Sequence, residues 1–320
     1  MKKLFNVVFA VLIFQLTLVA QVNPVLQVNG HNESVNVVAF SPDSKTLFSG
    51  GKDGAIFSWD VTAAFKQVKT IHVTDAAITS LSVNHAGNTL VVGTYCQILL
   101  YDAASLKRKA RNKKAHVSFA GSVNYSADDN YIVSSSWKEN ALMLWDAKNL
   151  KKVKQFAETV WTDEAMFTQD GKYIISANHA NNVKVWDIAT GNIVKTFAGH
   201  EDWVYAFRMT NDQSKLITAS FDKTIKIWDF ESGKQLSTLQ GHTDGIYQLA
   251  LTPDNKTLIS VAVDSTMRVW DLEKKAEVAN IKPASKVLGI TISPDGRYLA
   301  AGLEDHSIAI WELKDLIKGN

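Results

Sequence analysis

Short runs of alternating apolar and polar residues, separated by turn residues, recur along almost the whole chain. The stretch from Gly199 to Asp229 is representative. An apolar run begins there at Val204, a turn follows at 211–212, and a second alternating run ends at Trp228. Alternation with a period of two is typical of half-buried β-strands, and polar clusters between such runs mark turns. The pattern therefore predicts an all-β chain built from many short strands.

The same frame returns seven times, and each copy closes on an aromatic residue followed by an acidic one, at intervals of 41 to 44 residues. The closing pairs are Trp59-Asp60, Tyr101-Asp102, Trp145-Asp146, Trp186-Asp187, Trp228-Asp229, Trp270-Asp271 and Trp311-Glu312. Self-similarity at this period, with a Gly-His opening in several copies, is the signature of four-stranded propeller blades. From Val25 to about Leu313 the chain resembles the WD40 repeat family, and the resemblance implies one seven-bladed β-propeller.

The segment before the first Gly-His pair has no preceding blade to complete. In later copies the equivalent segment, such as 193–197, is the outermost strand of the blade before it. We therefore expect residues 24–29 to form the outer strand of the last blade, whose own chain ends near Trp311. Ring closure of this kind removes exposed strand edges.

The resemblance also implies a hydrogen-bonded network inside each blade. It joins an opening histidine, a serine or threonine ten residues before the closing tryptophan, an aspartate six residues before it, and the tryptophan itself. The network is complete as His31, Ser49, Asp53 and Trp59, as His200, Thr218, Asp222 and Trp228, and as His242, Ser260, Asp264 and Trp270. A buried carboxylate needs donors that satisfy it. Because these residues recur in register, we assign them to the scaffold and not to a catalytic triad, which occurs once per active site.

The remaining copies depart from this pattern. The second copy has Val91 and Tyr95 in place of the serine and aspartate, and the third keeps His116, Ser135 and Trp145 with Glu139 as the acid. The fourth has Ser176, Ala180 and Trp186, and the seventh has Ala301, Asp305 and Trp311. The fourth and seventh have no opening histidine. We expect the second and fourth blades to be the least regular.

The first residues lie outside the repeats and indicate export. A basic start precedes an almost continuously apolar run at 4–18, and a small residue, Ala20, ends the segment. We predict a signal peptide at 1–20, cleaved after Ala20, and a propeller domain at 21–320 in the periplasm or secreted space. A retained membrane anchor is the competing interpretation. The apolar run is short for a span and contains two polar residues, so we expect no stable membrane insertion after cleavage.

Composition narrows the choice of partner. The hydrophobic fraction of 46% is ample for a packed core, and the net charge of +2 argues against a broadly polyanion-binding surface. The basic run 107–114 favours a solvated strand edge over a nucleic-acid patch, and contact with an anionic surface outside the cytoplasm stays open. The single cysteine, Cys96, excludes a disulfide framework. The histidines lack metal-ligand spacing, so we expect no metal or cofactor.

Ligands of this family commonly meet the face formed by the loop after the opening Gly-His and by the tight turn before the internal aspartate. At those positions, aromatic residues gather on the third to fifth blades. The candidate partner-binding residues are Phe119, Trp137, Lys138, Trp161, His179, Glu201, Trp203 and Phe221. Exposed aromatic residues on a rim of mixed charge are typical anchors of protein contacts. The alternative is that these rings pack on one another, roof the blades and bind nothing.

The leading functional hypothesis is a non-catalytic, monomeric platform that holds a protein or peptide on this face, without a nucleic-acid partner. A second hypothesis is binding of a glycan or cell-envelope fragment on the same rings. A third is a propeller enzyme with a central-channel site, which would need carboxylates and histidines that converge on the axis. The acidic residues near the loops do not recur at channel-facing positions, and we therefore expect no enzyme.

Overall fold

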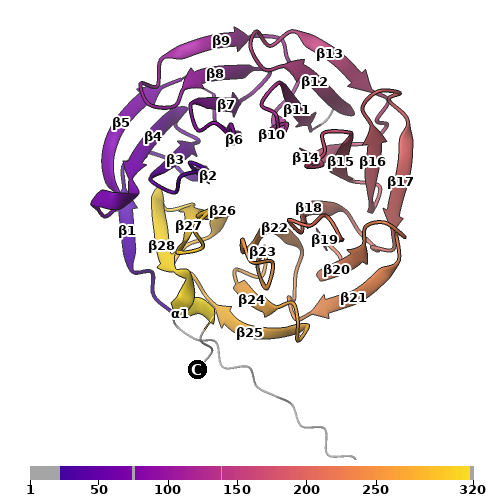
Figure 1. Ribbon diagram of the computed structural model, residues 1–320. Coiled ribbons are helices and arrows are strands. Elements are labelled where there is room, and N and C mark those ends of the chain that lie inside the picture. Colours follow the sequence, from indigo (N-terminus) through magenta and orange to yellow (C-terminus); the bar gives the residue numbers. More distant parts are fainter. Residues whose placement is uncertain (1–21, 74–75, 138, 318–320) are drawn as a thin grey trace, which may run out of the picture.

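Each of the seven copies folds into one four-stranded antiparallel sheet, and the seven sheets form a ring around a central axis (Figure 1). This computed structural model describes residues 22–73, 76–137 and 139–317. The predicted signal peptide therefore lies outside the described residues, as does Lys138. The predicted fold, a seven-bladed propeller of four-stranded antiparallel blades, is confirmed.

The blades follow one another along the chain, and each runs from an inner strand to an outer strand. Blades 1 to 3 contain β2 (Val35–Phe40), β3 (Thr46–Gly51), β4 (Ala55–Asp60), β5 (Lys66–His72), β6 (Ser80–Val83), β7 (Thr89–Gly93), β8 (Ile98–Asp102), β9 (Arg108–Asn112), β10 (Ala120–Tyr125), β11 (Tyr131–Ser136), β12 (Ala141–Asp146) and β13 (Lys152–Phe156). Blades 4 to 6 contain β14 (Thr162–Phe167), β15 (Tyr173–Asn178), β16 (Asn182–Asp187), β17 (Ile193–Ala198), β18 (Val204–Met209), β19 (Lys215–Ser220), β20 (Thr224–Asp229), β21 (Gln235–Gln240), β22 (Ile246–Leu251), β23 (Thr257–Ala262), β24 (Met267–Asp271) and β25 (Ala276–Ile281). Blade 7 contains β26 (Val287–Ile292), β27 (Tyr298–Leu303), β28 (Ser307–Glu312) and β1 (Leu26–Asn29), and two short helices are η1 (Val61–Ala63) and α1 (Leu313–Ile317).

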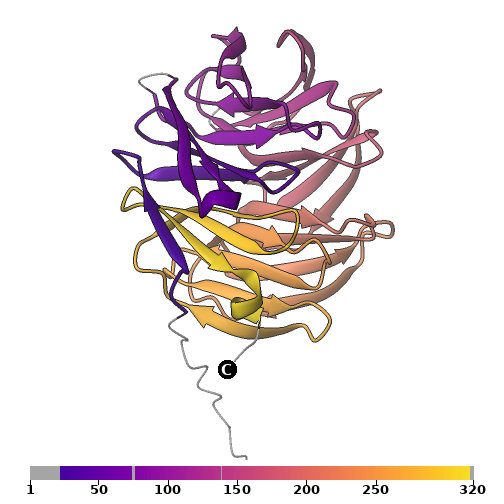
Figure 2. The same ribbon diagram turned by 60° about the vertical axis from the view of Figure 1, so that its left-hand side comes forward.

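The ring is closed by the N-terminal strand, as the sequence predicts. Strand β1 pairs with β28 in antiparallel register, with Leu26 opposite Ile310. Figure 2 shows the indigo strand beside the yellow strands of blade 7. A second link comes from Trp311, whose indole N–H donates to the carbonyl of Val22 at 3.0 Å. Because Ala301 stands where a serine would accept this bond, the N-terminal segment supplies the acceptor instead.

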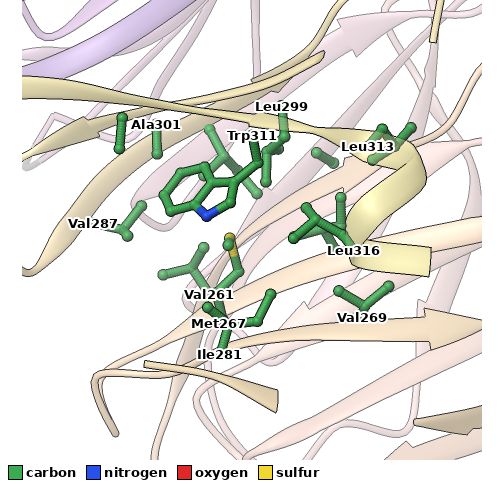
Figure 3. Packing of buried hydrophobic residues seen from close by; sticks show 14 of the residues in the cluster. Val261, Met267, Val269, Ile281, Val287, Leu299, Ala301, Trp311, Leu313 and Leu316 are labelled. Atoms are coloured by element: carbon green, nitrogen blue, oxygen red, sulfur yellow. The ribbon is translucent and has the colours of Figure 1, made fainter. Parts of the chain in front are cut away.

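The hydrophobic core lies between neighbouring blades. Figure 3 shows the cluster between blades 6 and 7, where Trp311 packs among Val261, Met267 and Val287, and α1 adds Leu316. Six further clusters repeat this arrangement among the described residues. Burial of apolar surface contributes about 25 cal/mol per Å². Stability therefore resides in blade-to-blade packing, and the polar faces and rim of the ring are left for contacts.

The prediction that blades 2 and 4 are the least regular is right for one of them. In blade 2 the inner strand β6 has four residues, and β7, β8 and β9 have five each. In blade 4 all four strands have six residues, so the prediction is wrong for this blade. The physical reason is an ion pair that replaces the missing histidine network, which is described below.

Candidate partner-binding face

The histidine-centred network of blade 5 is a continuous hydrogen-bonded chain. His200 contacts Asp222 through Nδ1 at 2.7 Å and Thr218 through Nε2 at 2.7 Å, and the Trp228 indole N–H donates to the same threonine at 2.9 Å. Equivalent contacts join His31, Ser49, Asp53 and Trp59 in blade 1 and His242, Ser260, Asp264 and Trp270 in blade 6. Each chain ties the start of a blade to its second and third strands.

The carboxylates of these networks are held in their charged form. Burial alone raises the pKa of Asp222, but bonds from His200, Thr224 and the Glu201 N–H outweigh it, and the pKa lies well below its usual range. Asp264 is held low in the same way. Hydrogen bonds to an ionised carboxylate favour that form. The network therefore contains satisfied, ionised aspartates without an exposed nucleophile.

Blade 3 corrects one sequence assignment. The serine that contacts His116 and Trp145 is Ser134, at 2.7 Å and 2.8 Å, and not Ser135. The turn between β11 and β12 has one residue more than the corresponding turns of blades 1, 4, 5 and 7, and the serine lies 11 residues before the tryptophan. Glu139 bonds His116 and the N–H of Val117, as the aspartate does elsewhere.

Blade 4 replaces the network with a different pair of charges. The Lys184 ammonium lies 2.6 Å from the buried carboxylate of Glu158, and Trp186 still donates to Ser176 at 2.9 Å. Asn178 accepts the N–H of Ala180, which shapes the turn that an aspartate shapes in other blades. Ion pairing with hydrogen bonds makes a buried carboxylate tolerable, so the blade stays regular.

The inner strands carry a β-bulge near their first residue in six blades, where two residues face one on the neighbouring strand. The bulged positions are Asn36, Gly121 with Ser122, Asp163, Tyr205, Tyr247 and Leu288. A bulge bends the strand and redirects a side chain. Most of these positions line a cavity of about 560 Å³ at the mouth of the central channel.

The channel changes character along its length. Its interior, a cavity of about 380 Å³, is lined by all seven inner strands, and an ion pair at 2.7 Å joins Glu164 of β14 to Arg208 of the neighbouring β18 on its wall. The mouth is lined in part by five aromatic residues, Phe119, Trp137, Tyr205, Phe221 and Tyr247, and Lys52 and Lys286 are also among its lining residues. Of the described residues that line the mouth, none is acidic.

The candidate rings form two groups on this face, which we call the aromatic surface: Phe119 and Trp137 on blade 3, and Trp161, His179, Trp203, Tyr205 and Phe221 on blades 4 and 5. Trp137, Trp161 and Trp203 are 39%, 41% and 39% exposed. On blades 4 and 5 the rings touch in sequence, with centroids 4.4 Å apart for His179 and Trp203 and 6.1 Å apart for Trp203 and Phe221. A side chain at Gly245 would collide with the Phe221 ring, so the glycine lets this ring lie flat on blade 6.

His179 is the centre of the second group. Its ring stacks on Trp203 with an interplanar angle of 9°, and its Nε2 lies 2.6 Å from a carboxylate oxygen of Asp163. The pair is close enough for ionic attraction but lacks the alignment of a hydrogen bond, and both atoms are buried without another partner. Burial raises the pKa of Asp163, and His179 partly offsets this effect. Burial of the Tyr205 side chain raises its pKa to about 12, with smaller contributions from the charges of Asp163 and Asp202.

The structure thus brings together Phe119 with Trp137, and Trp161, His179, Trp203 and Phe221 with one another. Glu201 is exposed at the edge and contributes its backbone N–H to Asp222. Sequence reasoning missed Asp163, Tyr205 and Tyr247, because the bulges on which they lie have no reliable sequence signature. The one available signal is their shared place, directly after the first residue of an inner strand.

Two absences among the described residues bear on other kinds of site. Within that part of the chain, no group of three or more His, Cys, Asp or Glu side chains is placed to hold a metal ion. No helix among the described residues is long and apolar enough to cross a membrane.

The repeated blades and the hydrogen-bonded histidine network define a seven-bladed propeller of the WD type. Comparison with family models agrees: residues 161–319 match the IFT122 first beta-propeller model, and residues 22–60 match the WD domain, G-beta repeat model. The chain belongs to the WD40 repeat family.

Curated proteins with similar sequences are distant. The chain is 24% identical over 174 residues to autophagy-related protein 16 of Arabidopsis thaliana, which covers 54% of this chain and 34% of that protein. It is 24% identical over 184 residues to pre-mRNA-splicing factor cwf17 of Schizosaccharomyces pombe (56% and 53%) and 29% identical over 127 residues to small ribosomal subunit protein RACK1y of Oryza sativa (37% and 36%). The matched segments therefore span about half the length of these relatives or less. WD40 propellers generally bind proteins and are generally not enzymes.

Proposed function

We propose that this chain is an exported, non-catalytic platform that holds a protein or peptide on its aromatic surface. The observation that carries the proposal is the exposure of Trp137, Trp161 and Trp203, each about two-fifths accessible, on one face beside the channel mouth. Tryptophan is enriched at the energetic centres of protein interfaces because its large flat surface is desolvated by a partner.

The contacts of the rings separate their structural and binding roles. Trp203 touches His179, Tyr205 and Phe221, so part of its surface already stabilises the fold. Trp161 has one aromatic contact, with His179 at 5.4 Å, and remains 41% exposed. Its exposed indole face is therefore available to a partner without disturbing the core. A ring that served only as a roof would be covered by its neighbours.

The rim around the rings is polar and of mixed charge, with Glu201 and Asp202 on blade 5 and Lys52 and Lys286 across the mouth. A polar rim around an aromatic centre is the usual anatomy of a non-obligate interface. This arrangement supports a partner that binds reversibly through a few anchors.

Export is supported by the order of charge, apolar run and small residue in 1–20. Cys96 is the chain's only cysteine, so an oxidising compartment could form no internal disulfide. The propeller is compatible with such a compartment because its stability comes from packing.

The experiment is crosslinking of the tagged protein in its native cells, followed by mass spectrometry of the captured material. Wild type is compared with Trp161→Ala and with a control, Tyr131→Ala, which removes an exposed ring at the start of β11, away from the aromatic surface. We expect Trp161→Ala to weaken the captured partner by about 2 kcal/mol, while its thermal unfolding stays close to that of wild type.

Equal capture by wild type and Trp161→Ala would place the interface elsewhere. Loss of folding in Trp161→Ala would assign this ring to the scaffold and would remove the argument from exposure. If no protein is captured but a glycan array retains the wild type and not the variant, the partner is a glycan stacked on the same ring.

A further inference from the structure

The outer strands of blades 1 to 3 and their flanking turns carry an unusual concentration of positive charge, which we call the basic rim. Residues 61–73 contain two cationic side chains, 103–115 contain six and 147–157 contain four, and none of these segments contains an acidic residue. The twelve are Lys66, Lys69, Lys107, Arg108, Lys109, Arg111, Lys113, Lys114, Lys148, Lys151, Lys152 and Lys154. They are about a third of the chain's 34 lysines and arginines.

These side chains face solvent. All but Lys154 are exposed, and β5, β9 and β13 lie next to one another along the outside of the ring (Figure 1). The nearest carboxylates belong to the closing residues of the third strands and are used by their own turns. Asp102 accepts the hydroxyl and N–H of Ser105, and Asp146 accepts two backbone N–H groups. Of the rim cations, Lys109 lies 3.6 Å from Asp102.

The charge is not a general property of outer strands in this ring. The equivalent segments of blades 4, 5 and 6, at 188–198, 230–241 and 272–282, contain either one lysine or nearly balanced lysines and glutamates. Strand β1, the outer strand of blade 7, contains no charged residue. A modest net charge of +2 therefore conceals one strongly cationic side of the molecule.

We propose that the basic rim binds an anionic lipid surface, with blade 2 facing that surface. Clusters of several lysines and arginines bind anionic bilayers through their summed attraction to the headgroups. Ten of the twelve rim cations are lysines, which act as mobile point charges, whereas arginine suits shaped, bidentate recognition of phosphate. The phenylalanine rings within the segments, Phe65 and Phe156, are buried, and the segments contain no tryptophan or tyrosine on which nucleic-acid bases could stack.

The distribution of charge also fits a flat partner. The rim is convex, and a plane that touches β9 meets β5 and β13 at a greater distance (Figure 1). The central blade carries six of the cations, and the flanking blades carry two and four. Attraction decays over a Debye length of about 10 Å at 0.1 M salt. A planar surface attracts mainly the cations at the point of closest approach, which is where the charge is highest. A flexible polyanion could instead follow the arc and contact all three blades evenly.

The basic rim and the aromatic surface are separate. The former lies on the outside of blades 1 to 3, and the latter lies on the loop face of blades 3 to 5 around the channel mouth. Binding through blade 2 leaves Trp161 and Trp203 open to a second partner. The lipid inference therefore does not depend on the proposed protein partner.

The test is co-sedimentation of the purified protein with vesicles of phosphatidylcholine that contain 30 mol% phosphatidylglycerol or none. The rim variant replaces Lys107, Arg108, Lys113 and Lys114 by Gln, and keeps Lys109 and Arg111, which bond Thr89 and Gln97. The control variant replaces Lys215, Lys234, Lys275 and Lys282 by Gln on blades 5 and 6. It removes the same charge from exposed positions, so only location differs.

We expect binding to the anionic vesicles alone, weakened at least about tenfold by 0.5 M salt. A cation near such a surface contributes a factor of about five, so the rim variant should lose at least about tenfold in partition and the control less than threefold. Trp161→Ala should bind vesicles as wild type does, and thermal unfolding should show that every variant is folded.

Three results would overturn the inference. Equal sedimentation with neutral vesicles would mean that binding does not depend on charge. Equal losses of vesicle binding in the two variants would mean that binding depends on net charge and not on the basic rim. Absence of vesicle binding at low salt, with retention of a DNA duplex of similar charge density, would assign the rim to a polyanion chain.

Discussion

Two histidine–aspartate pairs of this propeller look alike in a residue list and differ in almost every physical respect. His200 and Asp222 lie 2.7 Å apart inside blade 5, and His179 and Asp163 lie 2.6 Å apart beneath the aromatic surface, where His179 stacks on Trp203. The first pair has counterparts in blades 1 and 6, and a glutamate version in blade 3. The second occurs once among the described blades.

The difference lies in what else reaches the carboxylate. Asp222 accepts two backbone N–H groups and the Thr224 hydroxyl from its own hairpin and the preceding loop. Asp163 lies on a bulge of the inner strand β14 and is buried, with poorly aligned donors. Burial therefore dominates its pKa, which is raised, while the pKa of Asp222 is lowered. Polar residues that repeat in register stabilise the scaffold, and a pair that occurs once beside exposed rings marks the face on which contacts are made.

The largest expected effect is the loss of a complete network. Asp222→Ala removes the acceptor of His200, Thr224 and the Glu201 N–H, and leaves the buried His200 ring without its carboxylate partner. We expect a loss of about 3 kcal/mol in the free energy of unfolding, measured by urea denaturation.

The matched variant is Asp305→Ala in blade 7, which lacks the opening histidine and where the carboxylate bonds Ser307. We expect Asp305→Ala to lower the free energy of unfolding by about 1 kcal/mol. Similar losses at the two positions would contradict the view that the histidine network, and not the turn alone, gives the aspartate its importance.

The next largest effect is the dependence of the free energy of unfolding on acidic pH. The pKa of Asp222 is lower in the folded chain than the unfolded value of about 3.9. Between these values the unfolded chain binds more protons, so the stabilisation is complete above about pH 4 and is lost as pH falls through the folded pKa. Asp53, Asp264 and Glu139 shift in the same direction.

Urea denaturation of wild type and Asp222→Ala between pH 2 and 7 checks this sign. The difference between them should be constant above pH 5 and should shrink below pH 4, by at most about 1.4 kcal/mol per pH unit for one proton. A difference that grows in acid would mean that the carboxylate is not the ionised acceptor.

The sequence predicts the features that repeat in every blade well, and it predicts the features that occur in a single blade poorly. Seven registered copies identify the blades, and the Trp311 end of blade 7 identifies the ring closure, because a missing outer strand needs a donor. The serine of blade 3 was placed one residue late because a longer turn shifts the count. Asp163 and Tyr205 escaped prediction because a bulge decides their direction, and strand alternation does not encode bulges.

Blade 4 shows that a departure from the repeat does not by itself make a blade irregular. Its missing histidine suggested irregularity, but Lys184 reaches Glu158 from the third strand and restores a buried ion pair. Only the three-dimensional structure shows that the two substitutions compensate for one another. Departures from a repeat therefore need a check for a substitute before they are interpreted as disorder or as function.

The smallest expected effect tests the comparison of the two pairs most directly, because substitution of Asp163 should change the free energy of unfolding in the opposite direction to substitution of Asp222. Asp163→Asn keeps the volume of the side chain and removes a charge whose ionised form is disfavoured by burial. Because the folded pKa is raised, the wild-type carboxyl costs stability above an unfolded pKa of about 3.9, and this cost disappears in acid. We expect Asp163→Asn to raise the free energy of unfolding at pH 7 by up to about 1 kcal/mol and to leave it unchanged at pH 3, as measured by urea denaturation.

The control is Asp222→Asn, the same substitution in the scaffold, which should lower the free energy of unfolding at pH 7 by about 2 kcal/mol. If both variants lose stability equally, Asp163 belongs to the scaffold as well, and the aromatic surface holds no pair distinct from the repeated network.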